Sequence, residues 1–153
     1  MANTQAMCTS FKGELLVGHH NFGTGVTRGS TAADTFKAAL YLASATVNAS
    51  TTAYSATNEV SGTGYTAGGV TVTFGTAPST SGTTAFVTPS ASISYSAVTL
   101  ATAFDAVLIY NSTQSNKAVS VHTFGSQTIT AGTFTLTMPS NTTSTALLRL
   151  ATT

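Results

Sequence analysis

The sequence predicts an all-β fold, an antiparallel β-sandwich or jelly roll of about nine or ten short strands, on three observations. Apolar and polar residues alternate along most of the chain, as in strands with one buried face. Serine and threonine make up about a third of the residues, and β-branched threonine suits a half-exposed strand surface. Turn signals recur roughly every 8–12 residues. We therefore expect a single β-sandwich domain over residues 1–153, with an extended N-terminal segment.

The first third of the chain is predicted to hold two strands separated by a loop. The apolar stretch Phe11–Val17 ends at Gly18 and is predicted as a strand. The glycine- and threonine-rich residues His19–Ala33 are predicted as a loop. Residues Asp34–Ala43 fit either a strand or a short helix capped by its first aspartate. The strand is favoured because the following residues keep no 3.6-residue period.

A glycine-rich loop and a strand occupy the middle of the chain. Four glycines fall between Gly62 and Gly69, which disfavours a regular element there. We expect a tight turn packed against the sheet, with Tyr65 as its anchor. No lysine followed by serine or threonine comes after the last glycine, so the segment does not fit a phosphate-binding loop. The alternating strand Val70–Phe74 follows it, where a dinucleotide-binding fingerprint would need a helix.

The second half of the chain is predicted to hold most of the other strands, after a loop at Ala77–Thr84. Two runs, Phe104–Tyr110 and Ala146–Leu150, are apolar on both faces. They predict either central strands covered on each side or strands covered by a partner subunit. Shorter alternating segments predict further strands at Ile93–Tyr95, Val119–Val121 and Phe134–Met138.

The composition argues against several classes of function. Only 6% of the residues are charged and the net charge is +1, without the clustered cations that nucleic-acid binding needs. No stretch approaches the ~20 apolar residues that span a bilayer, so we expect no membrane insertion. The N-terminal residues lack the basic and apolar regions of a signal peptide, which predicts synthesis in a cytoplasm. Cys8 is the only cysteine, so no intramolecular disulfide can form.

The sequence offers little for catalysis or cofactor binding. The three histidines, His19, His20 and His122, lack the spacing of a metal site, and adjacent histidines on an extended chain point to opposite faces. No Gly-x-Ser-x-Gly elbow accompanies the many serines. Four acidic residues leave little for paired-carboxylate catalysis. We therefore expect no enzymatic activity, no metal and no cofactor.

The few charged residues are candidate structural or interface positions. Asp34 and Lys37 lie in an otherwise apolar segment, and Asp105 interrupts the apolar run Phe104–Tyr110. Because an unpaired buried carboxylate is costly, each aspartate should be exposed or paired. Arg28 is the predicted partner of Asp34, since the intervening loop is short enough to fold back. The alternative is that Arg28 reaches a neighbouring subunit of an assembly.

The scarcity of charge also predicts self-association. Free β-proteins guard their sheet edges with lysines, prolines or inward charges, and this chain has only five basic residues and three prolines. A neutral surface of hydroxyl and methyl groups suits a subunit that stays docked. We expect a homo-oligomer around a symmetry axis, a trimer in preference to a dimer. The alternative is a monomer that its hydroxyl groups keep soluble.

Several segments, in order along most of the chain, carry a resemblance to a known family: Gly18–Phe22, Asp34–Tyr41, Glu59–Gly69, Ala106–Asn111 and Phe134–Pro139. In these segments the sequence resembles small virion structural proteins of tailed bacteriophages, of the capsid decoration or cement type. The resemblance implies a protein of the capsid surface that bridges major capsid subunits, and it implies no catalytic residues.

The expected partners are accordingly the major capsid protein and further copies of the chain. The composition agrees with this, because many weak contacts around a shell add up as avidity without any chemistry. A tail, fibre or head-tail connector subunit, which could bind a host receptor, is the alternative function.

Overall fold

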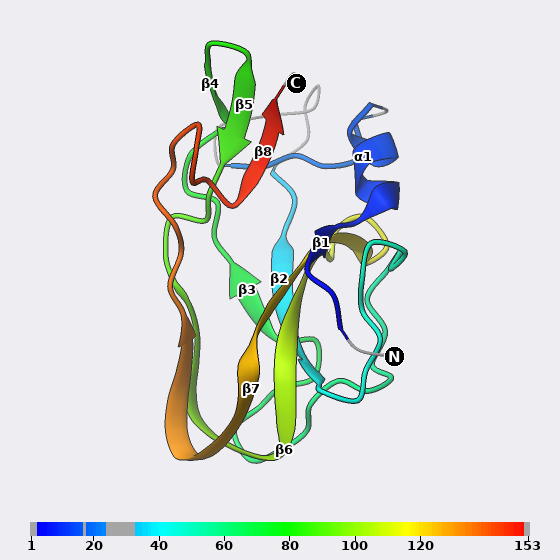
Figure 1. Ribbon diagram of the computed structural model, residues 1–153, viewed down its shortest axis with the longest axis vertical. Coiled ribbons are helices and arrows are strands. Elements are labelled where there is room, and N and C mark those ends of the chain that lie inside the picture. The colour runs from blue at the N-terminus through cyan, green and yellow to red at the C-terminus, as the bar shows by residue number, and fades with distance from the viewer. Residues whose placement is uncertain (1–2, 17, 24–32, 152–153) are drawn as a thin grey trace.

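The computed structural model describes residues 3–16, 18–23 and 33–151, and its strands form two antiparallel sheets (Figure 1). The elements in chain order are β1 (Ala6–Met7), α1 (Thr9–Leu16), β2 (Phe36–Leu42), β3 (Val70–Val72), β4 (Ser79–Ser81), β5 (Thr84–Val87), β6 (Ile93–Asn111), β7 (Lys117–Leu136) and β8 (Leu148–Ala151). The predicted all-β sandwich is confirmed, and the architecture is compatible with a jelly roll.

The larger sheet has five strands in the order β1-β7-β6-β2-β3, so β6 lies at its centre. From Phe104 to Tyr110 every residue except Asp105 is buried, which confirms that this run is a central strand covered on both faces. β2 pairs with β6 from Phe36 to Leu42, and this confirms the strand interpretation of Asp34–Ala43.

β6 and β7 form one long hairpin that bends back on itself (Figure 1). These strands have 19 and 20 residues, whereas the sequence predicts four separate short strands in the same region. Register shifts interrupt their pairing, and Ala97 and Ala131 adopt positive φ angles of 54° and 44°. The described residues therefore contain eight strands, fewer than the predicted number, because segments predicted as separate are continuous.

The smaller sheet has the order β4-β5-β8. Of the two interpretations of Ala146–Leu150, the central strand is wrong, because β8 lies at the edge of this sheet and Leu150 is 48% exposed. Cover by a partner subunit stays a prediction. The prediction of a loop at Ala77–Thr84 is also wrong in part, because β4 pairs with β5 there. The loop at Gly62–Gly69 and the strand that follows it are confirmed.

The strand predicted at Phe11–Val17 is wrong, because helix α1 occupies this segment. Phe11 and Leu15 are four residues apart, so one face of the helix carries both toward the core. The helix ends in a Schellman motif: Gly18 adopts a φ of 70°, its N–H bonds to Leu15 O, and the N–H of His19 bonds to Glu14 O. The seven residues of Phe11–Val17 make only about two helical turns, which is too short to distinguish a helical from a strand period in the sequence.

The core is one cluster of buried side chains that extends from Cys8 to Leu148. At the α1 end it contains stacked and edge-to-face rings, with Phe22 and Phe36 at a centroid distance of 4.4 Å. His20 stacks beside both rings, at 6.3 and 6.4 Å. An imidazole thus lies inside the apolar cluster that joins α1 to the large sheet.

Candidate functional site

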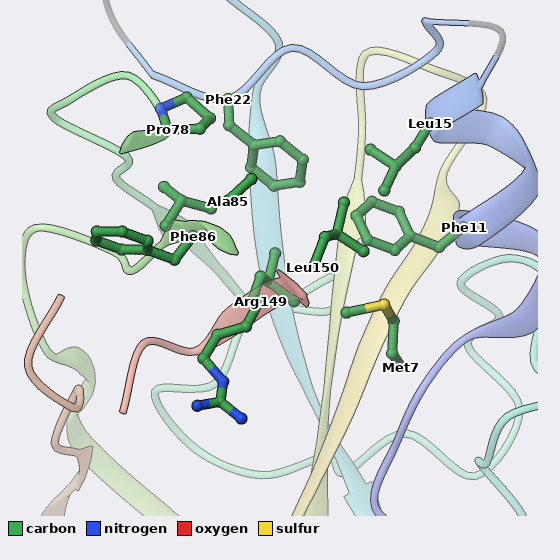
Figure 2. Close-up of a pocket in the computed structure, with 11 residues that line it drawn as sticks. Met7, Phe11, Leu15, Phe22, Pro78, Ala85, Phe86, Arg149 and Leu150 are labelled. Atoms are coloured by element: carbon green, nitrogen blue, oxygen red, sulfur yellow. The ribbon is translucent and has the colours of Figure 1, made fainter. Parts of the chain in front are cut away.

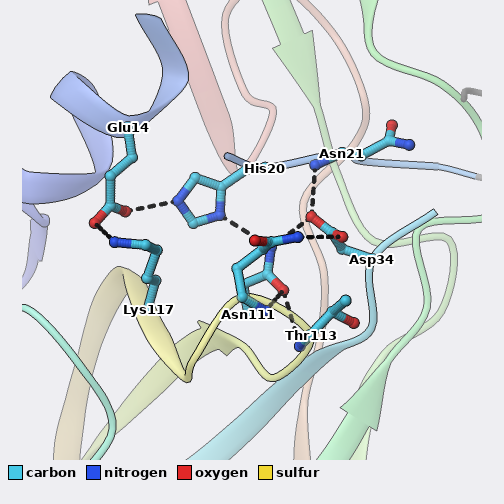
Figure 3. Close-up of polar contacts among 8 residues, drawn as sticks. Glu14, His20, Asn21, Asp34, Asn111, Thr113 and Lys117 are labelled. Atoms are coloured by element: carbon cyan, nitrogen blue, oxygen red, sulfur yellow. Dashed lines mark hydrogen bonds and ion pairs between the residues drawn. The ribbon is translucent and has the colours of Figure 1, made fainter. Parts of the chain in front are cut away.

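A buried polar network connects α1 to the turn of the β6–β7 hairpin (Figure 3). The side chain of His20 has no exposed surface, and its Nε2 lies 2.8 Å from Glu14 Oε2. On the other side of this carboxylate, Lys117 Nζ lies 2.7 Å from Glu14 Oε1. Burial raises the pKa of Glu14, but the hydrogen bonds from Lys117 and His20 outweigh it and hold this pKa below its usual value.

Asn111 is the centre of this network, and its surroundings fix the proton on His20. Its Oδ1 accepts the backbone N–H groups of Thr113 and Gln114, each at 3.1 Å. Its Nδ2 therefore donates, to Asp34 Oδ2 at 2.8 Å and to His20 Nδ1 at 3.1 Å. His20 is thus neutral, with its proton on Nε2 and donated to Glu14. Burial lowers the pKa of His20, against the opposing effect of Glu14.

Asp34 holds several donors, as the cost of an unpaired carboxylate requires. Besides Asn111, the backbone N–H of Asn21 donates to its Oδ2 at 3.0 Å, and Gln114 Nε2 donates to its Oδ1 at 3.3 Å. Arg28, the predicted partner of Asp34, lies outside the described residues. Asp34 therefore fastens the residues after α1 to the β6–β7 turn (Figure 3).

A second network surrounds Glu59, which is 9% exposed. Tyr54 and Tyr65 each donate a hydroxyl to its carboxylate at 2.7 Å, and Gly68 donates its backbone N–H at 2.8 Å. The Tyr65 hydroxyl also accepts the N–H of Leu40 in β2 at 3.0 Å. Tyr65 thus anchors the glycine-rich loop to the large sheet, and burial together with the bond to Glu59 raises the pKa of its hydroxyl.

The other two candidate positions are Lys37 and Asp105. Lys37 is half-buried in β2, opposite Thr71 of β3 and Tyr110 of β6. Asp105 is half-buried in β6 and accepts a hydrogen bond from Asn3 Nδ2, so it ties the segment before β1 to the sheet. Lys37 Nζ lies near Gly68 of the loop that Tyr65 anchors, 4.0 Å from where a Cβ at Gly68 would stand, whereas Asp105 bonds to the N-terminal segment.

The sequence predicts neither of the two network centres, Asn111 and Glu59. The only signal for Glu59 is that an acid lies close in sequence to two tyrosines, Tyr54 and Tyr65. In each network the polar side chains bond mainly to other members of the same network, which suits a structural role. Among the described residues, no group of three histidine, cysteine or acidic side chains could hold a metal ion. Cys8 is buried, and burial raises the pKa of its thiol to about 11.

An apolar cavity of about 90 Å³ lies between the small sheet and the N-terminal elements (Figure 2). β8 lies between the side chains of β5 and those of β1 and α1 (Figure 2). The lining side chains come from β1, α1, β5, β8 and two loops: Met7, Phe11, Leu15, Phe22, Pro78, Ala85, Phe86, Val87, Leu148, Arg149 and Leu150.

The outer edge of β7 is the second surface feature that the networks do not explain. β1 pairs with this edge only at Ser120 and Val121. From His122 to Leu136 the described residues pair with β7 on the β6 side alone. This stretch contains no lysine, arginine, proline or acidic residue, and the residues from Gly125 to Thr128 are exposed.

Among the residues with described positions, no helix is both long and apolar enough to span a membrane. No protein-family model, curated protein or solved structure matches this chain. A relation to bacteriophage virion proteins therefore stays a prediction from the sequence segments given above.

Proposed function

We propose that this protein is a virion structural protein that decorates and cements a bacteriophage capsid by bridging major capsid subunits. The observation that carries the proposal is the outer edge of β7, which is unguarded from His122 to Leu136. Free backbone groups on an edge without charges or prolines favour pairing with another chain. Such an edge suits a subunit that is permanently bound in an assembly.

The distribution of charge supports the same proposal. All four acidic residues of the chain have partners within it: Glu14, Asp34, Glu59 and Asp105. The exposed surface therefore consists mainly of hydroxyl, amide and methyl groups. Such a surface can approach a neighbouring subunit closely at a low desolvation cost, and repeated contacts around a shell add up as avidity.

Cryo-electron microscopy of the purified virus particle that encodes this chain tests the location. We expect density for the chain on the capsid surface, with a copy number comparable to that of the major capsid protein. A few copies at one vertex would instead support the alternative, a tail, fibre or head-tail connector subunit that could bind a host receptor. Absence of the chain from purified particles, checked by mass spectrometry, would overturn both functions.

The proposal includes self-association, with a trimer favoured over a dimer. Light scattering of the recombinant protein at micromolar concentration should give a mass well above 15.4 kDa. A charged guard, Thr128→Lys, should lower that mass, because Thr128 is exposed on the free part of β7. Exposed Thr80 on β4 offers a control position, since Thr80→Lys leaves the β7 edge unchanged. A monodisperse monomer for the wild type would contradict self-association of the free protein.

A further inference from the structure

The edge of β8 and the apolar cavity beside it form one surface. Among the described strands, β8 pairs with β5 alone, from Leu148 opposite Val87 to Ala151 opposite Thr84. Its other side faces α1 and β1 across the cavity. Arg149, Leu150 and Ala151 are exposed, and within the described ranges no further backbone hydrogen bond reaches them besides their pairing with β5.

The size and lining of the cavity define the side chain it can take. Its walls come from aliphatic, aromatic and methionine side chains, including Met7, Phe11 and Leu15. At about 90 Å³ it is smaller than the ~150 Å³ apolar cavity that accepts benzene in an engineered protein. It therefore suits an aliphatic side chain of another polypeptide better than an aromatic ring.

The charge of Arg149 indicates which ionised group a partner would carry. Its guanidinium group points away from the apolar side chains (Figure 2), and its Nη1 donates to the carbonyl oxygen of Thr143 at 2.9 Å. In the described part of the chain no carboxylate bonds to it, because the four acidic side chains hold other groups. The cation is therefore available to a carboxylate of a partner.

We propose that β8 binds an extended segment of a different polypeptide, which adds a strand to the β4-β5-β8 sheet. The segment places an aliphatic side chain in the cavity and a carboxylate beside Arg149. This is β-augmentation, in which main-chain hydrogen bonds provide affinity and the pocket provides specificity. A second copy fits less well, since antiparallel pairing of two β8 strands would bring two Arg149 guanidinium groups close together.

The inference rests on the proposed function, because a shell protein would supply the segment, and it can be tested without a virus. The probe is a labelled hexapeptide, Thr-Val-Thr-Leu-Thr-Asp, added to the ¹⁵N-labelled full chain. We expect amide shifts at β8 and at Met7 and Phe11. The peptide with lysine in place of aspartate should bind about tenfold more weakly, and a version N-methylated at alternate residues should not bind.

Two variants locate the site. Ala85→Leu places a larger side chain in the lining of the cavity and should weaken binding at least about tenfold. Leu150→Lys guards the edge at a residue that is already 48% exposed, so folding should be unaffected and binding should be lost. Thr80→Lys on β4, the opposite edge of the same sheet, is the matched control and should bind as the wild type does. Arg149→Gln should remove the preference for aspartate over lysine.

The inference is overturned if the peptide causes no shifts at millimolar concentration. It is equally overturned if Ala85→Leu and Leu150→Lys bind as the wild type does, or if the shifts map to β7. If this protein binds the peptide at β8 but is absent from purified virus particles, the proposed function is refuted and the inference about β8 stands. Conversely, particles that carry the Leu150→Lys protein at normal copy number would refute the role of β8 and leave the proposed function standing.

Discussion

Replacing Asn111 by alanine should destabilise the protein by about 3 kcal/mol. The substitution removes the donor to His20 Nδ1 and a donor to Asp34, both in the buried network. A buried polar group left without a partner costs about 1–3 kcal/mol. The N–H groups of Thr113 and Gln114 also lose their acceptor, but they lie in a turn that water can reach and add less.

Urea unfolding followed by far-ultraviolet circular dichroism measures this effect. The dependence of the unfolding free energy on urea concentration, the m-value, should be unchanged. Gln114→Ala is the matched control, because it removes a single long bond of 3.3 Å to the same Asp34. We expect the control to lose less than about 0.5 kcal/mol. If the two variants lost the same stability, Asn111 would not be the centre of the network.

Asn111→Asp gives a second readout through the sign of the pH dependence. In the wild type the pKa of His20 is lowered below 6.5, so the unfolded chain binds more protons and the His20 contribution is lost as the pH falls through 6.5. In the variant a carboxylate faces both Nδ1 of His20 and the carboxylate of Asp34, so the imidazolium gains an acceptor and the pKa of His20 should rise. Repulsion between the two carboxylates should raise one of their pKa values, which acts in the same direction. The variant should therefore become more stable between pH 8 and 6, relative to the wild type. A decline parallel to that of the wild type would refute the assigned proton position.

Four further outcomes are expected. Glu59→Ala should lower the unfolding free energy by about 3 kcal/mol, and Glu59→Gln by only about 1 kcal/mol, because glutamine retains an acceptor for the tyrosines. Equal losses in urea unfolding would argue against the acceptor role. Gly69→Ala should cost more than about 2 kcal/mol, because its φ is 71° and a Cβ would overlap the Ala38 carbonyl oxygen, whereas Gly125→Ala, with no atom within 4 Å, should be nearly neutral. Burial lowers the pKa of His122 to about 4, so up to about 3 kcal/mol should be lost from pH 6.5 to 4, and His122→Gln should flatten that decline in acid titrations. Cys8 should react with a thiol reagent only at the rate of unfolding, and rapid labelling of the native protein would show that its burial is incomplete.

The elements that the sequence predicts well are those in which burial alone sets the pattern. Phe104–Tyr110 is apolar on both faces because β6 is central, and the same run reads as central in the sequence. Ala146–Leu150 has a similar composition and yet forms an edge. Hydrophobicity predicts that a side chain is covered but does not say by what. Leu150 borders an apolar cavity and is 48% exposed, so its apolar character does not place it inside the sheet.

The errors in the N-terminal third and in the hairpin have local causes. A helix of eight residues shows too few turns to separate its period from that of a strand. The long strands β6 and β7 depend on bulges near Ala97 and Ala131, where alanine adopts an unusual φ that no composition rule predicts. The pairing is regular over Ile93–Tyr95 and Ala106–Ile109, but register shifts at Phe104 and Tyr110 fall inside the predicted strand Phe104–Tyr110.

The two polar networks depend on contacts between residues far apart in sequence. His20 meets Asn111 and Glu14 meets Lys117 because β7 returns beside α1, and no local spacing predicts this. The charge count alone shows that each of the four acids needs a partner; it does not show which.

The pairing of β2 with β6 also determines when the chain can fold. Phe36 pairs with Asn111, about 75 residues later. During synthesis, β2 therefore cannot pair with β6 until most of the chain has left the ribosome. The β6–β7 hairpin, in contrast, can close from its turn outward, beginning at Asn111 and Lys117. Refolding should then proceed from a hairpin that forms early to a slower closure of β2 over it, as expected when a long loop must be ordered before its contacts form.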